Sequence, residues 1–324
     1  MYLLSASGIE WWDATWNPIP GSVKKRQRGF DPRLVPATLT EPFSWKQRRR
    51  ILVTPRSDLF QDGMPDSSID RIFAVMALAP RHTFQVLTKR AERMRAYLSD
   101  HTLFTRIVDA CNHAADGSEA VSGVTPSLTL LARGVRREPQ LMHWPLMNVW
   151  LGVSVENQHS AHDRIPLLLQ TPAAVRFLSC EPLLGAVDLS HYIGLAVARS
   201  GDVRQRRGGG YDKWPGDVAG PGTRGDPRYD GEPRLHWVIV GGESGPGARP
   251  FALAWARSIL KQCRCGAVPV FVKQLGARAA TELMRDVDGH DTREQRWLVL
   301  NDRTGGDMSE WPVDLRVREF PEVR

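Results

Sequence analysis

The fold is decided by Arg50-Ile51-Leu52-Val53-Thr54, an apolar run that leads into the polar residues Arg56-Ser57-Asp58. Later runs repeat this form, and each also ends at a polar or charged residue: 82–87, 149–153, 175–178, 237–240 and 268–272. Helix-like stretches lie between most of the runs. Strands that alternate with helices pair in parallel, because each helix carries the chain back across the sheet. The sequence therefore predicts an α/β fold in which mostly parallel strands form a (β/α) barrel.

Charged side chains stand at or just after the ends of these runs. They are Asp58, Lys89, Glu156, Glu181, Glu243 and Lys273. In such a barrel the C-terminal ends of the strands converge on one mouth, where catalytic residues gather. This pattern makes all of them except Glu243 candidate catalytic residues. The alternative is that they form salt bridges between neighbouring strands, since buried charges need partners.

The bulk composition is that of an ordinary globular protein, with 42% hydrophobic and 24% charged residues. The formal net charge of +7 favours anionic partners, although many proteins that bind none are equally basic. Only four cysteines occur in 324 residues, which indicates a reducing, cytoplasmic location. We expect no signal peptide and no membrane span, because no apolar run approaches ~20 residues.

The chain is expected to fall into three parts. Residues 1–50 are irregular and rich in Trp, Pro and Arg, residues 51–280 form the barrel, and residues 281–324 form an extension with a small hairpin. Within the barrel, residues 198–234 are rich in Gly, Arg, Asp and Pro and lack apolar periodicity, so we expect a mobile insertion. Clear helices are predicted at 65–79, capped by Asp66 or Ser67, and at 161–170, where Pro166 favours a later start.

A glycine-rich element follows the run at 237–240 and reads Gly241-Gly242-Glu243-Ser244. Glycines at a strand end permit close approach of the backbone to a ligand. Arg249 stands nearby in the sequence and is suited to pair with a carboxylate or phosphate. We therefore take Ser154, at the end of another run, together with Gly241, Gly242, Glu243, Ser244 and Arg249 as candidate ligand-binding residues. The alternative is a tight structural turn.

Aromatic and basic residues are interleaved near the N-terminus: Trp11, Trp12, Trp16, Lys24, Lys25, Arg26 and Arg28. This combination is suited to stacking and phosphate contacts in nucleic acid. Two plainer explanations stand beside it, namely tryptophans that plug a barrel edge and a basic loop that is simply solvated.

Several blocks of the chain resemble one known family. They are Ile9-Glu10-Trp11-Trp12-Asp13-Ala14-Thr15-Trp16-Asn17-Pro18, Ser57-Asp58-Leu59-Phe60, Phe73-Ala74-Val75-Met76, 82–90, 148–156, 181–185, 240–250 and 271–274. Together they resemble the phage-associated three-cysteine-motif proteins, a radical-SAM-like family of poorly known function. The resemblance covers most of residues 8–276. It implies a partial (β/α) barrel that holds a [4Fe-4S] cluster and S-adenosylmethionine.

The chain departs from that family where the cluster cysteines are expected. The stretch after Asn17, residues 18–29, contains no cysteine and is instead short and basic. A cluster that cleaves S-adenosylmethionine needs three thiolate ligands. Cys111, Cys180, Cys263 and Cys265 do not have a suitable spacing, so we expect no standard cluster.

Two hypotheses follow. The first is a radical-SAM-like barrel that has lost its iron-sulfur loop and either binds a nucleoside-type ligand weakly, S-adenosylmethionine among the options, or is a degenerate copy of a radical enzyme. The alternative is a nucleic-acid-binding accessory protein without catalysis. The sequence leaves the substrate and the oligomeric state open.

Overall fold

A computed structural model of the chain describes residues 11–13, 39, 41–54, 57–115, 144–193, 195–197, 203–205, 234–282 and 296–322. For residues 11–13, 112–115, 195–197, 203–205 and 282 it describes the backbone alone. The basic stretch 18–29 and most of the insertion at 198–234 lie outside these residues.

A seven-stranded sheet has the strand order β1-β2-β3-β4-β5-β8-β10. Its strands are β1 (Trp11–Asp13), β2 (Arg50–Val53), β3 (Thr83–Thr88), β4 (Val149–Ser154), β5 (Val175–Cys180), β8 (Trp237–Gly241) and β10 (Val270–Gln274). Strand β1 pairs antiparallel with β2, and the other six strands are parallel. These six are the apolar runs of the sequence, so the predicted partial (β/α) barrel is confirmed.

Helices lie between most of the parallel strands, as the alternation predicts. The described α-helices are α2 (Glu41–Ser44), α3 (Asp66–Leu78), α4 (Ala91–Leu98), α5 (Leu103–Ala115), α7 (Gln158–Gln170) and α8 (Leu253–Cys265). Two short 3-10 helices, η2 (Met308–Glu310) and η3 (Val313–Leu315), lie near the C-terminus. Among the described residues, no helix combines the length and the apolar character needed to cross a membrane.

Two details of the helices differ from the sequence prediction. The N-cap of α3 is Pro65, which makes no side-chain cap hydrogen bond, so the predicted cap at Asp66 or Ser67 is wrong. Helix α7 begins at Gln158 and runs through Pro166. Its start is fixed by Asn157, whose Oδ1 accepts from the backbone N–H of Ser160 at 3.0 Å, as an N-cap residue does.

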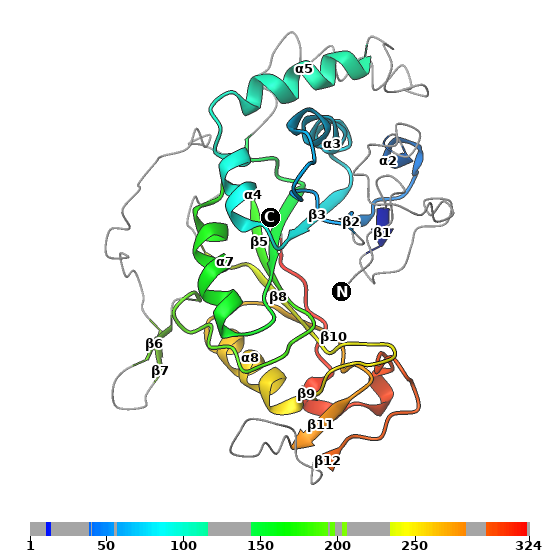
Figure 1. Cartoon of the computed structure of the whole chain (residues 1–324), viewed down its shortest axis with the longest axis vertical. Helices are drawn as coiled ribbons and strands as arrows, with labels where there is room; N and C mark the ends of the chain where they lie inside the picture. Colours follow the sequence, from blue (N-terminus) through cyan, green and yellow to red (C-terminus); the bar gives the residue numbers. More distant parts are fainter. Residues whose placement is uncertain are drawn as a thin grey trace. The chain divides into compact units, whose positions relative to one another are not determined.

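The chain divides into two compact units, each of which is described by itself. Unit 1 comprises residues 1–152, 170–175 and 219–231, and unit 2 comprises 153–169, 176–218 and 232–324. In unit 1, helix α5 packs against α3 (Figure 1). Tyr97 on α4 lies between Phe60 and Phe73, with ring centroids 5.8 Å away in each case. These aromatic contacts form part of the core of unit 1.

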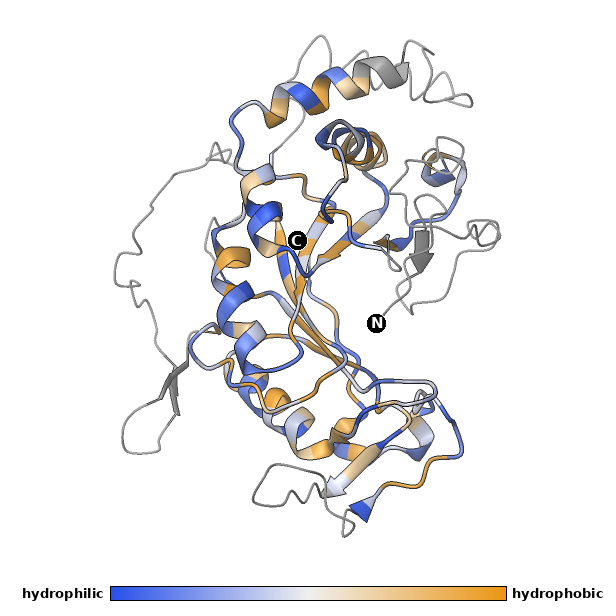
Figure 2. Ribbon diagram, in the orientation of Figure 1, coloured by the Kyte–Doolittle hydropathy of each residue, from blue (hydrophilic) through white to orange (hydrophobic). Residues whose placement is uncertain are grey.

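Unit 2 has an aromatic core around Trp237 of β8. Its ring lies 5.8 Å from that of Phe177, 6.0 Å from Phe271 and 5.3 Å from Phe320, measured between centroids. Figure 2 shows the strands of the sheet mostly in the hydrophobic colour, whereas the helices alternate between hydrophobic and hydrophilic residues. Helix α8 buries Leu253, Ala256, Ile259, Leu260 and Cys263.

The C-terminal segment of unit 2 runs along β10. The N–H of Val272 donates to the carbonyl of Val317, and the N–H of Glu319 donates to the carbonyl of Val270, both at 2.8 Å. Phe271 and Arg318 form an antiparallel bridge.

Unit 2 also contains two smaller sheets. One has the order β12-β11-β9, from β9 (Phe251–Ala252), β11 (Ala279–Glu282) and β12 (Arg296–Trp297). The other joins β6 (Leu195–Val197) and β7 (Val203–Gln205) in antiparallel fashion. The insertion predicted at 198–234 is described only at β7 and at Arg234, and the remaining residues of that prediction lie outside the described part.

Candidate functional site

The strand-end residues belong to two different units. Asp58 and Lys89 lie in unit 1, after β2 and β3. The other candidates lie in unit 2: Ser154, Glu156, Glu181, Gly241, Gly242, Glu243, Ser244, Arg249 and Lys273.

Asp58 is the centre of a saturated hydrogen-bond cluster in unit 1. Its Oδ1 accepts from the Thr88 hydroxyl at 2.6 Å and from the N–H of Phe60 at 2.9 Å. Its Oδ2 accepts from the N–H of Lys89 at 2.9 Å and from the guanidinium of Arg90 at 3.1 Å. Both oxygens thus have two donors each, and the side chain is only 13% exposed. Asp58 joins the loop after β2 to the end of β3, which is a structural role, and its carboxylate is occupied.

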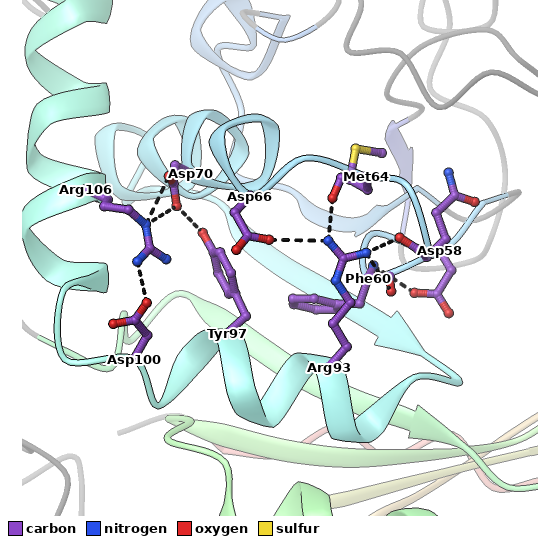
Figure 3. A network of polar contacts seen from close by, with 10 residues as sticks. Asp58, Phe60, Met64, Asp66, Asp70, Arg93, Tyr97, Asp100 and Arg106 are labelled. Carbon is purple, nitrogen blue, oxygen red and sulfur yellow. Dashed lines mark hydrogen bonds and ion pairs between the residues drawn. The ribbon is translucent and has the colours of Figure 1, made fainter.

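The loop after Asp58 is clamped from α4 by Arg93 (Figure 3). The guanidinium of Arg93 donates to the backbone carbonyls of Phe60, Gln61 and Met64 and lies 3.3 Å from the carboxylate of Asp66.

A second network in Figure 3 joins α3, α4 and α5. Tyr97 donates to Asp70 at 2.6 Å, and Arg106 pairs with Asp70 at 3.2 Å and with Asp100 at 2.6 Å. Burial, with the hydrogen bond to Asp70, raises the pKa of Tyr97, which keeps its hydroxyl neutral and able to donate. Both networks join neighbouring elements of unit 1 through side-chain hydrogen bonds.

Glu181 in unit 2 has a different environment. Its Oε1 accepts from the Lys273 ammonium at 2.7 Å and from the Gln274 amide at 3.3 Å. Its Oε2 is buried and has no hydrogen-bond partner among the described residues. The two charged side chains are 13% and 18% exposed, respectively, so the pair lies at the border of the core. Glu181 is therefore anchored through one oxygen, while the other is buried without a partner among the described residues.

Gly241 and Ser179 extend this polar group. A Cβ on Gly241 would come within 3.3 Å of the Glu181 Cγ, so the absence of a side chain leaves room beside the carboxylate. Ser179 lies on β5, two residues before Glu181 in the sequence. Its hydroxyl is buried and also lacks a hydrogen-bond partner among the described residues. Together, Ser179, Glu181, Gly241, Lys273 and Gln274 form what we call the Glu181 site.

Glu156 and Ser154 are held by α7. The guanidinium of Arg164 lies 2.8 Å from Glu156 Oε2 and donates to the carbonyl of Ser154, also at 2.8 Å. Glu156 thus forms an ion pair, as the alternative to a catalytic role proposes. The cation comes from helix α7 and not from a neighbouring strand.

The second glycine of the predicted binding element has a packing role. A Cβ on Gly242 would meet the Leu275 carbonyl oxygen at 2.3 Å, closer than any real contact. Gly276 (φ 78°) and Gly305 (φ 67°) continue this close backbone packing, because a Cβ on Gly305 would meet the Gly276 oxygen at 2.5 Å. The structural-turn alternative accounts for Gly242.

Glu243 and Arg249 pair with one another. The Arg249 side chain donates to both carboxylate oxygens, at 2.7 and 3.0 Å, and its backbone N–H donates to Oε2 at 3.0 Å. These hydrogen bonds from Arg249 lower the pKa of Glu243, so it stays ionised. Ser244 is exposed in the loop between them. The guanidinium of Arg249, which was predicted to bind a ligand, is thus paired with Glu243.

The cysteines do not suit an iron-sulfur cluster. Cys111, Cys180 and Cys263 are buried and Cys265 is exposed. Burial raises the pKa of Cys111 and of Cys263 to about 12 and that of Cys180 further, so these residues are neutral thiols in the core, whereas a cluster binds thiolates. No group of three His, Cys, Asp or Glu side chains in the described residues is arranged to hold a metal ion. The donor set therefore does not fit the cluster that the resemblance implies.

Three polar residues were missed by the sequence analysis. They are Gln274, Arg164 and Arg93, which hold the strand-end carboxylates or their loops in position. Only Gln274 follows an apolar run directly, so only this residue could have been found from the pattern of strand ends. The tryptophans and basic residues near the N-terminus yield no test, because their side chains lie outside the described part.

No curated protein and no solved structure matches the chain. A family model does match, over residues 24–302, and this range includes the Asp58 cluster and the Glu181 site. The chain therefore belongs to the family described as Protein of unknown function (DUF5131).

Proposed function

We propose that the chain is a binding protein for a small, cationic nucleoside-type ligand of the S-adenosylmethionine kind, acting without an iron-sulfur cluster. The observation that carries the proposal is Glu181 Oε2, a buried carboxylate oxygen with no hydrogen-bond donor among the described residues. Leaving such an oxygen unpaired costs about 1–3 kcal/mol, which a ligand donor would recover. The amino group of S-adenosylmethionine or a ribose hydroxyl supplies a donor of this kind.

The neighbours of Glu181 support this choice. Lys273 and Gln274 hold Oε1, so the carboxylate is already oriented before a ligand arrives, and preorganised groups lose less entropy on binding. The charge of Lys273 is already paired with Glu181, so the requirement on the ligand is a donor for Oε2. The ammonium group at the amino-acid end of S-adenosylmethionine meets it. The resemblance to radical-SAM-like proteins is in agreement with this ligand class.

Affinity should be weak, because the iron that chelates the amino-acid end of the ligand in active relatives of this kind has no ligand set here. We expect a Kd of about 0.1–1 mM, with each factor of ten worth about 1.4 kcal/mol.

Calorimetry with S-adenosylmethionine tests the proposal on three variants of the full chain. Glu181→Gln should weaken binding about tenfold, because the amide presents a donor in place of an acceptor. Asp314→Asn is the matched control: it removes a carboxylate that pairs with Arg257 at 2.7 Å on the exposed surface, and it should leave binding unchanged. Glu243→Ala should also retain binding, since Arg249 already occupies both oxygens. No heat at millimolar ligand, or equal heat from Glu181→Gln, would leave the degenerate copy of a radical enzyme as the better hypothesis.

A further inference from the structure

A basic segment lies at the opposite end of the unit 1 strands from Asp58. Residues 45–50 read Trp-Lys-Gln-Arg-Arg-Arg and lead into β2, and residues 42–57 contain no Asp or Glu. Arg81 comes just before β3, whose Thr83 pairs with Arg50 in register. The cations Lys46, Arg48, Arg49, Arg50 and Arg81 thus gather at the N-terminal ends of β2 and β3. We call this group the basic edge.

The basic edge is held in place by specific contacts. The guanidinium of Arg81 donates to the carbonyl of Phe43 at 2.8 Å, and the backbone N–H of Arg49 donates to His82 Nδ1 at 3.1 Å. The other ring nitrogen of His82 lies 2.9 Å from the Pro42 carbonyl oxygen. The Arg49 guanidinium lies over the Trp45 ring, 5.1 Å from its centroid. These contacts join the segment to the start of β3, so the backbone that carries the cations is held in place.

Four of the five cations of the basic edge have no ion-pair partner among the described residues. No ion pair within the described part of the chain involves Lys46, Arg48, Arg49 or Arg81. Three of these side chains, Lys46, Arg48 and Arg81, are exposed. The Nε of Arg49 is buried and lacks a hydrogen-bond partner in the described part as well. Other arginines of unit 1, such as Arg90 and Arg106, pair with carboxylates. Lys46, Arg48, Arg49 and Arg81 thus form a group of neighbouring cations without a carboxylate partner among the described residues.

We propose that the basic edge binds the phosphate backbone of nucleic acid. Four of its five cations are arginines, whose planar guanidinium groups bind phosphate oxygens through two parallel hydrogen bonds. Several cations fixed along consecutive residues suit a repeating polyanion better than a single small anion. Contacts of this type are independent of base sequence, so the surface positions a nucleic acid without reading it. The inference does not depend on the Glu181 site, which lies in unit 2.

The test measures fluorescence anisotropy of a labelled DNA duplex of about 20 base pairs of mixed sequence, titrated with the full chain at several salt concentrations. The logarithm of the binding constant should fall linearly with the logarithm of salt, with a slope of about −0.9 per phosphate neutralised. The double variant Lys46→Glu with Arg48→Glu should weaken binding at least about tenfold at about 50 mM salt and reduce the slope by about two.

The matched control is Lys261→Glu with Arg303→Glu in unit 2, two exposed cations that also lack an ion pair among the described residues. It changes the net charge by the same amount and should change duplex binding less than about twofold. Equal loss in both double variants would overturn the inference, because net charge alone would then explain the binding. Absence of binding by the native chain, or binding only to phosphatidylserine vesicles and not to duplex, would overturn it too.

Discussion

Asp58 in unit 1 and Glu181 in unit 2 are both carboxylates that follow a parallel strand, yet their surroundings differ. Each oxygen of Asp58 accepts from two donors. Glu181 uses Oε1 for Lys273 and Gln274, while Oε2 has no donor in the described residues. The same position in the sequence pattern thus gives a fully hydrogen-bonded carboxylate in one unit and a buried, unpaired acceptor in the described residues of the other. The number of donors around each oxygen, rather than the position at a strand end, separates the two roles.

The replacement of Asp58 by Asn should have the largest effect on stability. In either orientation the NH₂ group faces an obligate N–H donor, that of Phe60 at the Oδ1 position or those of Lys89 and Arg90 at the Oδ2 position. We expect a loss of about 2–3 kcal/mol in the free energy of unfolding, because at least one buried donor loses its acceptor and the charge attraction to Arg90 is reduced. Urea denaturation measures this loss. Asp62→Asn, at an exposed position in the same loop, should change stability by less than about 0.5 kcal/mol. A similar small change at Asp58 would remove the distinction between the two carboxylates.

The isosteric change Glu181→Gln should cost less. The amide NH₂ can take the place of Oε2, where no donor is lost, while the carbonyl oxygen still accepts from Lys273 and Gln274. Only the charge attraction to Lys273 is reduced, so we expect about 1 kcal/mol or less, given the partial exposure of the pair. The same urea experiment measures it. A loss as large as that of Asp58→Asn would mean that Oε2 has a donor in the protein.

His82 is a buried residue of unit 1 whose ring accepts a hydrogen bond, and its protonation should make the stability of the protein depend on pH. Its Nδ1 accepts from the N–H of Arg49, and burial holds the pKa of the ring below its ordinary value of 6.5, with Arg81 and Arg49 adding to the effect. The unfolded chain therefore binds a proton first, so stability is full above pH 6.5 and falls as pH drops through the lowered folded pKa. Trp45 and Phe84 are the rings in contact with His82, and neither titrates.

Urea denaturation from about pH 7.5 to about pH 5 measures the effect as a difference between variants. His82→Gln should show a shallower loss of stability in acid than the native chain. His101→Gln is the control, because the His101 side chain is 96% exposed and should leave the pH dependence unchanged. Parallel pH profiles for the native chain and His82→Gln would show that this ring does not contribute.

The strands could be predicted from the sequence because their signal is local. Each apolar run is long enough to form a buried strand, and the intervening helices require parallel pairing. The course of α7 could not be predicted, because the penalty of Pro166 is local whereas the burial of Ile165 and Leu168 that offsets it is a property of the fold.

The candidate site was only partly predictable for the same reason. The sequence places Glu181 and Lys273 at strand ends, and parallel pairing brings β5, β8 and β10 together. Nothing local shows that Arg249 turns back to Glu243, which depends on the loop containing Gly245 (φ 98°) and Gly247 (φ 79°). Nor does it show that Gly242 packs on the Leu275 backbone. Both contacts belong to loops whose path is set by tertiary structure.

The pairing of residues 317–319 with β10 has a consequence for self-association. Strand β10 ends the order of the seven-stranded sheet, and an uncovered terminal strand offers unpaired N–H and C=O groups to another molecule. Here Val317 and Glu319 take up that hydrogen bonding, next to the apolar residues Val270, Phe271 and Val272. The covering residues lie beyond residue 302, where the match to the family ends. A fragment trimmed to the matched region would keep the Glu181 site yet expose a strand that can recruit other chains into aggregates.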